Sequence, residues 1–288
     1  MEALVSTAWL ARELGLAGPG PRPTPPRVVD VRYYLDPARK GQDAFRAGHI
    51  PGAVFLDMDK DLSAPGGGRG LARGRHPWPD EPQVARVMSA AGIGPGVRVV
   101  AYDDASGGTA ARLWYLLRAH GHDKVAVLDG GIAKWQAEGR PLTTEETQVE
   151  PAFFVARLRP GMVVSKAEMV REHARRLVLD ARVGERYRGE QEPVDTRAGH
   201  VPGARNAPWT ENLTDGAQPV FRSAAELRAR YVGLGALREE PIVYCGSGVT
   251  ACHGLLALHL AGLRGRLYAG SWSEWSSDPE LPAETGSA

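Results

Sequence analysis

Two copies of one pattern run through this chain of 288 residues in the same order. Each copy opens with an apolar run that ends in Asp-x-Arg, at Asp30 and again at Asp180. An Ala-Gly-His-x-Pro-Gly-Ala segment follows in both, with His49 in the first half and His200 in the second. Because chance similarity does not preserve order in this way, we predict a duplicated domain, each copy folding about its own core.

The spacing between the copies indicates an insertion in the first one. His200 follows His49 by 151 residues, whereas Tyr244 follows Tyr102 by only 142. Nine additional residues therefore lie between His49 and Tyr102. That interval contains the segment 65–77, which is rich in glycine and proline and is predicted to be a loop.

Each half alternates short β-branched runs with helical patterns. Buried parallel strands are predicted at short apolar, β-branched runs, as at 97–102, 125–128 and 241–244. Helical periodicity occupies ranges such as 110–120 and 250–261. Strands that alternate with helices imply parallel crossovers. The predicted fold class is therefore α/β, with two tandem domains that are each a doubly wound parallel sheet flanked by helices.

A linker is predicted between the two copies. The sequence over 141–160 mixes proline, threonine and glutamate without clear periodicity. The first domain is accordingly predicted at 1–140 and the second at 161–288.

Composition and charge narrow the classes of function. Basic and acidic residues number 35 and 34, so no basic stripe indicates nucleic acid or an anionic membrane, and a small substrate or a protein partner is favoured. Ser6 and Thr7 before Trp9 and Leu10 predict a capped helix rather than a signal peptide, and no run reaches transmembrane length. Two cysteines make no disulfide framework, so a cytoplasmic location is expected.

Cys245 stands where open α/β sheets bind their ligands, after the predicted strand 242–244 and before a helix that begins at Ala251. Gly246 and Gly248 let the intervening loop turn its backbone N–H groups inward, which makes an anion nest beside a helix N-terminus. Such a nest stabilises the nucleophilic thiolate and would stabilise a persulfide anion equally. The alternative, a buried structural cysteine, has no need of a Gly-x-Gly loop.

The second cysteine, Cys252, has a different setting. It lies within the predicted helix, seven residues after Cys245. That spacing fits neither a Cys-x-x-Cys redox pair nor a zinc site. We predict that Cys252 packs in the core and that the protein has no metal site.

These motifs resemble the rhodanese superfamily, and within it the 3-mercaptopyruvate and thiosulfate sulfurtransferases. The resemblance covers nearly the whole chain, because the Asp-x-Arg strand, the Gly-His turn and a late Gly-x4-Trp segment, ending at Trp135 and Trp275, match in both halves. Asp103 occupies the nucleophile position of the first half, which is similar to the inactive N-terminal domain of the family. The resemblance thus implies one catalytic centre, at Cys245.

The loop sequence indicates the sulfur donor. Cys-Gly-Ser-Gly-Val-Thr resembles the mercaptopyruvate type, whereas thiosulfate enzymes tend to have Arg and Lys after the cysteine. Thiosulfate carries two negative charges and would benefit from such cations, while mercaptopyruvate has one carboxylate that a hydroxyl and more distant arginines can hold. Thiosulfate remains the alternative donor. The resemblance implies a catalytic Ser247 and substrate contacts from the other loop residues, namely Gly246, Gly248, Val249 and Thr250.

Further site residues are implied by the same resemblance. Arg186 matches an arginine that pairs with the substrate carboxylate. A second substrate arginine of the family follows a Glu-Pro step, where this chain has valine, so Arg197 is the nearest candidate. Asp59 and His76 match a carboxylate and a histidine that join Ser247 in a proposed catalytic relay.

The implied activity is sulfur transfer through a Cys245 persulfide, from a small-molecule donor to cyanide or to a thiol such as that of thioredoxin, without a cofactor. Two other functions are weighed against it. A cysteine-dependent phosphatase needs an arginine at the end of the loop, where this chain has Ala251. A non-catalytic rhodanese-like interaction module typically lacks the cysteine.

Overall fold

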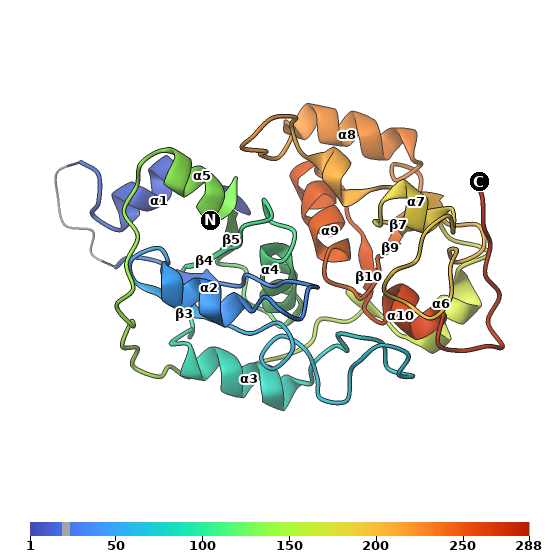
Figure 1. Ribbon diagram of the computed structural model, residues 1–288, viewed down its shortest axis with the longest axis horizontal. Helices are drawn as coiled ribbons and strands as arrows, with labels where there is room; N and C mark the ends of the chain where they lie inside the picture. Colours follow the sequence, from blue (N-terminus) through green and yellow to red (C-terminus); the bar gives the residue numbers. More distant parts are fainter. Residues whose placement is uncertain (19–23, 288) are drawn as a thin grey trace. The chain divides into compact units, whose positions relative to one another are not determined.

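The computed structural model describes residues 1–18 and 24–287. The chain forms two compact units, each built on a five-stranded parallel sheet with helices around it (Figure 1). The predicted α/β fold class with two tandem domains is confirmed. Within the described residues, no helix is long and apolar enough to cross a membrane.

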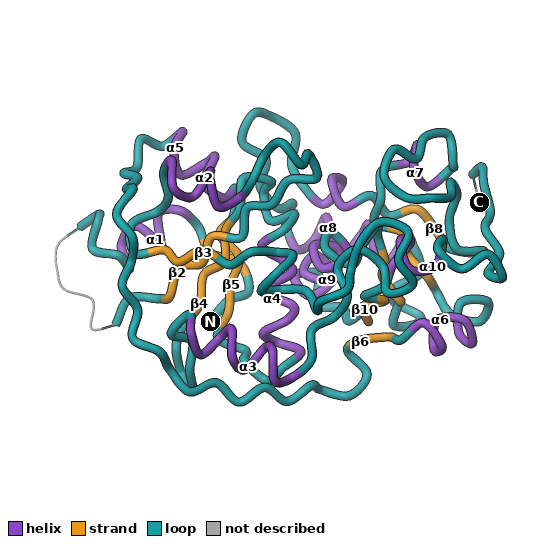
Figure 2. The backbone as a smooth tube through the Cα atoms, turned by 60° about the horizontal axis from the view of Figure 1, so that its bottom comes forward, coloured by secondary structure: helices purple, strands orange, loops and turns teal. Residues whose placement is uncertain are grey.

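The sheet of the first unit has the strand order β1-β5-β4-β2-β3. Its strands are β1 (Leu4–Val5), β2 (Arg27–Asp30), β3 (Ala53–Phe55), β4 (Val99–Tyr102) and β5 (Val125–Leu128). Its helices are α1 (Thr7–Glu13), α2 (Gly41–Ala47), α3 (Glu81–Ala90), α4 (Ala110–Ala119) and α5 (Gly131–Ala137). Strands β4 and β5 are buried along their whole length, as their continuous apolar runs predict. Figure 2 shows β2, β3, β4 and β5 as neighbouring segments of the backbone. The expected cap of α1 is present, since the Ser6 side chain accepts a hydrogen bond from the N–H of Trp9.

The sheet of the second unit has the strand order β6-β10-β9-β7-β8. Its strands are β6 (Val163–Val164), β7 (Val178–Asp180), β8 (Arg205–Asn206), β9 (Ile242–Tyr244) and β10 (Arg266–Tyr268). Its helices are α6 (Lys166–Glu172), α7 (Gly184–Tyr187), α8 (Ala224–Gly233), α9 (Ala251–Leu260) and α10 (Ser271–Trp275), with a 3-10 turn at Trp209–Asn212. Counted from the start of each copy, the strand order is the same in both units. The repeat in the sequence is therefore also a repeat of topology.

The repeated Asp-x-Arg motif is a buried ion pair at the end of one central strand in each sheet. Arg32 and Asp30 pair at 2.6 Å after β2, and Arg182 and Asp180 pair at the same distance after β7. Each arginine also donates to the glycine carbonyl of the following Gly-His turn. Burial opposes the charge of Arg182, but the Asp180 carboxylate outweighs it and holds the pKa of the guanidinium above its ordinary value. The motif thus fixes the turn to the strand in both copies.

The histidines of the two turns have equivalent surroundings. His49 Nδ1 lies 2.9 Å from the carbonyl oxygen of Phe45, and the two rings stack. His200 Nδ1 lies 2.8 Å from the carbonyl oxygen of Tyr187, again with stacked rings. Both histidines are buried. These contacts agree with a structural role that does not depend on the presence of a nucleophile.

The bounds of the two compact units differ from those of the predicted domains, 1–140 and 161–288, and of the predicted linker, 141–160. The range 141–158 belongs to the first unit, where Phe154 is buried and its N–H donates to the Ser89 hydroxyl at 3.0 Å. The inserted loop belongs to the second unit, where the N–H of Arg75 donates to Ser273 Oγ at 3.1 Å. The first unit comprises 1–62, 80–158 and 215–221, and the second comprises 63–79, 159–214 and 222–288.

Candidate active site

Cys245 is the first residue after β9, and the loop that it begins runs to Thr250 before α9. The cysteine is only 1% exposed. The backbone N–H of Gly248 donates to its Sγ at 3.1 Å. Gly248 has φ +76°, and a Cβ there would collide with the carbonyl oxygen of Ala269, so the position requires glycine. The Gly-x-Gly sequence therefore folds the loop back toward the sulfur.

The equivalent loop of the first unit already contains an anion. Asp103 follows β4 as Cys245 follows β9, and its carboxylate is fully buried. Four backbone N–H groups donate to it at 2.7–2.9 Å, those of Ala105, Gly107, Thr109 and Ala110. This arrangement is an anion nest at the start of a helix. Since the two units share one topology, it shows what the loop geometry of this fold can hold.

The first residues of α10 form hydrogen bonds with the backbone of Cys245. The N–H of Cys245 donates to Ser271 Oγ at 3.1 Å, and its carbonyl accepts from the N–H of Trp272 at 2.9 Å. In the first unit the carbonyl of Asp103 accepts from the N–H of Ile132 at the same distance. The repeated Gly-x4-Trp segment thus anchors the Asp103 loop in the first copy and the Cys245 loop in the second.

His76 and Ser247 are in direct contact. The Nδ1 atom of His76 lies 2.7 Å from Ser247 Oγ, and the two residues are 2% and 6% exposed. Such a histidine can exchange a proton with the hydroxyl group, in a direction that depends on its tautomer. The inserted loop therefore supplies a titratable group to the loop of Cys245.

Asp59 belongs to the first unit, after β3. It is exposed, and its backbone N–H donates to the side chain of Asp57 at 2.9 Å. Its participation in a relay with His76 stays a prediction.

Arg186 lies on α7 among buried acids. Its Nη2 donates to Glu192 at 2.7 Å and to Asp195 at 3.0 Å, and its Nε donates to Glu192 at 3.2 Å. Burial opposes the charge of Glu192, but the Asp195 N–H and the Arg186 guanidinium outweigh it and hold the pKa of Glu192 below its ordinary value. Nη1 of Arg186 would lie 3.3 Å from a Cβ placed on Gly246. These pairs hold the guanidinium beside the nucleophile loop.

Arg75, which no sequence motif indicates, lies beside the same loop. Its Nη1 pairs with Asp195, and its side chain is only 10% exposed. Its Nη2 would lie 2.6 Å from a Cβ on Gly246. In the sequence, only its place directly before His76 points to a role for Arg75, because His76 matches a site residue of the family.

Arg197 has other neighbours. Its guanidinium lies 5.9 Å from the ring of Trp272, and its Nη2 is 3.5 Å from the carbonyl oxygen of Asp278. The three atoms nearest to a Cβ on Gly246 belong instead to Arg75 and Arg186. A substrate-binding role for Arg197 stays a prediction.

Val249, Thr250 and Cys252 connect the loop to α9. Thr250 is the N-cap residue of that helix, and Val249 is 5% exposed. Cys252 is fully buried, and its thiol donates to the carbonyl of Gly248 at 3.3 Å, as suits a packing residue. Over residues 1–18 and 24–287, no group of three His, Cys, Asp or Glu side chains is arranged to hold a metal ion.

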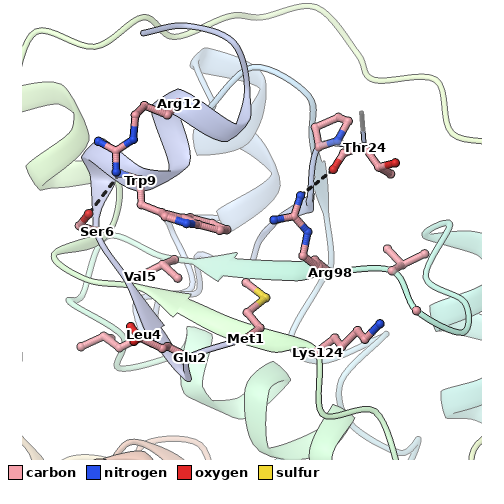
Figure 3. Close-up of a pocket in the computed structure, with 13 residues that line it drawn as sticks. Met1, Glu2, Leu4, Val5, Ser6, Trp9, Arg12, Thr24, Arg98 and Lys124 are labelled. Carbon is pink, nitrogen blue, oxygen red and sulfur yellow. Dashed lines mark hydrogen bonds between the residues drawn. The ribbon is translucent and has the colours of Figure 1, made fainter. Parts of the chain in front are cut away.

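A separate pocket of about 840 Å³ lies in the first unit, at the ends of β1, β4 and β5 where the strands begin (Figure 3). Arg98 on its wall donates to the carbonyl of Thr24 at 2.6 Å and pairs with Glu13 at 2.8 Å. Trp9 lies between Arg12 and Arg98 in the close-up. None of the described residues that line this pocket is a cysteine or a histidine.

Comparison with known proteins agrees with this geometry. The model of the rhodanese-like domain matches residues 8–138 and 165–278. A Pseudomonas aeruginosa protein named "Probable 3-mercaptopyruvate sulfurtransferase" is 43% identical over 265 residues, which cover 90% of this chain and 92% of that protein. The thiosulfate sulfurtransferase of Bos taurus is 35% identical over 287 residues, covering 95% of this chain and 91% of the relative.

Among solved structures, the 3-mercaptopyruvate sulfotransferase SseA from Escherichia coli is similar with a TM-score of 0.79 and 31% identity. The match covers 94% of this chain and 99% of that one. Three observations lead to the same assignment. The chain has two parallel sheets of the same topology, a cysteine in one loop and an aspartate in the equivalent loop, and similarity over almost its full length. The chain belongs to the rhodanese family of sulfurtransferases and carries two rhodanese-like domains.

Proposed function

We propose that this protein transfers sulfur from 3-mercaptopyruvate to a thiol through a persulfide on Cys245. The observation that carries the proposal is the contact of the Gly248 N–H with Cys245 Sγ, in a loop where His76 bonds to Ser247. A donated N–H stabilises the thiolate before the transfer and the persulfide after it. The name of the P. aeruginosa relative supports the choice of donor.

In the first transfer, the Cys245 thiolate attacks the sulfur of mercaptopyruvate. An S–S bond forms while the C–S bond of the donor breaks, and the electron pair of that bond becomes the enolate of pyruvate. The enolate takes up one proton and leaves as pyruvate, with the sulfur retained on Cys245. The rate depends on the thiolate fraction and on the stability of the leaving enolate.

Ser247 and His76 are suited to the proton that this step requires. The hydroxyl group can donate to the enolate while His76 Nδ1 replaces that proton, since the two atoms are 2.7 Å apart. The family resemblance implies that Asp59 orients His76. The relay therefore acts on the leaving group, and the sulfur nucleophile is activated by the loop.

The charges around the loop favour a monoanionic donor over thiosulfate, which is the alternative. Residues 246–250 contain no cation. Arg75 and Arg186, the two arginines beside the loop, belong to a cluster in which three arginines pair with three carboxylates. The cluster consists of Arg75, Arg182, Arg186, Asp180, Glu192 and Asp195. A balanced cluster offers directed N–H donors but little net charge, and this suits one planar carboxylate better than a dianion.

The second transfer passes the outer sulfur to an acceptor. A thiolate attacks that sulfur, a new S–S bond forms on the acceptor, and Cys245 leaves as the thiolate. Cyanide can take the sulfur in the same way. A protein dithiol such as thioredoxin would then release hydrogen sulfide by closing its own disulfide. Both cysteines of this chain are free thiols, which agrees with a reducing compartment such as the cytoplasm.

Steady-state kinetics with mercaptopyruvate and thiosulfate at matched concentrations test this proposal. The specificity constant is expected to be higher for mercaptopyruvate. Mass spectrometry of the donor-treated protein is expected to find one added sulfur on the peptide that contains Cys245. A higher specificity constant for thiosulfate would assign the alternative donor, and the absence of a persulfide with either donor would contradict the mechanism.

A further inference from the structure

Two guanidinium groups from distant parts of the chain face the same residue of the nucleophile loop. Nη2 of Arg75, from the inserted loop, would lie 2.6 Å from a Cβ on Gly246, and Nη1 of Arg186, from α7, would lie 3.3 Å from it. We propose that Arg75 is a substrate-binding residue that holds the donor carboxylate over Gly246 together with Arg186. This inference rests on the proposed function, because it requires a sulfur donor that carries a carboxylate.

Both arginines have hydrogen-bonding capacity on the side that faces the loop. The side-chain hydrogen bonds of Arg186 run from Nε and Nη2, so within the described residues Nη1 has no acceptor. Arg75 uses Nη1 for Asp195, and its buried Nε has no hydrogen-bond partner among residues 1–18 and 24–287. A buried donor without an acceptor is costly unless a ligand satisfies it. The site therefore has N–H groups in place for an anion.

Asp195 holds the pair of arginines in position before substrate arrives. Its Oδ1 accepts from Arg75 and its Oδ2 accepts from Arg186. The side chain of Asp195 is 1% exposed, and its N–H donates to Glu192 at 2.9 Å. Because the two long side chains are already ordered, less conformational entropy is lost when a carboxylate binds. Asp195 is thus a positioning residue for both arginines.

Gly246 is small for reasons of space. Its φ lies outside the left-handed region, so an alanine would fit the backbone. The atoms that an added methyl group would meet are the ends of the two arginines. A flexible side-chain end can move away, and the expected effect of the methyl group is displacement of Arg75 rather than unfolding.

The test uses the full chain and two alkylating probes of one size, iodoacetate and iodoacetamide. In both reactions the Cys245 thiolate forms an S–C bond and iodide leaves, but only iodoacetate carries a carboxylate. The ratio of the two rates therefore measures the carboxylate contact and cancels any change in thiol reactivity. Variants Arg75→Gln and Arg75→Lys are compared with Arg73→Gln, which changes an exposed arginine of the same loop.

We expect Arg75→Gln to lower the rate ratio by about tenfold to a hundredfold and to raise the KM for mercaptopyruvate by a similar factor, with kcat changed far less. Arg75→Lys retains a charge without the planar fork and is expected to fall between wild type and Arg75→Gln. Arg73→Gln is expected to match wild type. Gly246→Ala, which keeps both charges, is expected to lower the same ratio.

An unchanged rate ratio in both Arg75→Gln and Gly246→Ala overturns the inference. Equal losses with the charged and the neutral probe also overturn it, because they would show a disturbed loop rather than a lost carboxylate contact. The alkylation assay does not depend on sulfur transfer. A wild-type protein that forms no persulfide with mercaptopyruvate would therefore contradict the proposed function, while the rate ratio would still decide the role of Arg75.

Discussion

His76 Nδ1 lies 2.7 Å from Ser247 Oγ although 171 positions separate the two residues in the sequence. The histidine belongs to the insertion that distinguishes the first copy from the second, yet the folded loop is part of the second unit. The loop of Cys245 is therefore completed by a segment that precedes β4 and β5 of the first sheet in the sequence. Four predictions concern this site.

Cys245→Ser is expected to abolish sulfur transfer, whereas Cys252→Ser is expected to retain most of it. Cys245 accepts a backbone N–H from the loop, while Cys252 is fully buried within α9. Peptide mass spectrometry after donor treatment measures the site of the added sulfur. A persulfide found on Cys252 alone would refute this assignment.

Arg186→Ala is expected to raise the KM for mercaptopyruvate more than it lowers kcat. Loss of one charge-assisted hydrogen bond weakens binding by about 1.5–3 kcal/mol. The matched control is Arg188→Ala, two residues later, where the arginine pairs with the exposed Glu190. Identical kinetics in the two variants would show that Arg186 does not contact the substrate.

Ser247→Ala and His76→Gln are expected to lower kcat by similar factors, about a hundredfold if the pair acts in general acid catalysis. The double variant is expected to lose little more than either single variant, because the two groups handle one proton. Steady-state kinetics of the three proteins give the coupling directly. Additive losses would indicate that the two side chains act independently and would contradict a shared proton across the 2.7 Å contact.

The ion pairs around Glu192 predict a pH dependence of stability. A carboxyl whose pKa is lower in the folded state stabilises the protein above its unfolded pKa, about 4.3, and this stabilisation is lost as pH falls through the folded value. Urea unfolding of wild type and Glu192→Gln is expected to show a constant difference above about pH 5 and a smaller one in more acidic solution. Glu190→Gln, which removes a surface pair with Arg188, is the control and is expected to change little. A difference that does not vary with pH would contradict the role of the Glu192 charge.

Sequence repetition predicted the fold well because topology depends on patterns that survive in both copies. The Asp30 and Asp180 motifs end equivalent strands, and the order of strands is the same in the two sheets. The position of Cys245 followed from the alternation of strand, glycine loop and helix. Local patterns of this kind can be recognised in a single sequence without knowledge of the folded structure.

The contacts of Arg75 could not be predicted in the same way. Its partner Asp195 lies 120 positions away, and neither residue is part of a repeated motif. Long-range pairing of loop residues is decided by how the whole unit folds, and loops have no periodicity to reveal it. For the same reason the sequence could not show that 63–79 belongs to the second unit. This segment is a loop without strands or helices of its own.

The carboxylate of Asp103 has a consequence for stoichiometry. A side chain that fills its own nest cannot be displaced by a donor or replaced by a transferred atom, so the first copy has nothing to exchange. Titration with a sulfur donor is therefore expected to saturate at one sulfur per chain in a protein whose sheets, turns and anchoring segments all occur twice. Repetition of the sheets and turns is thus expected to leave the number of sites that can carry sulfur at one per chain.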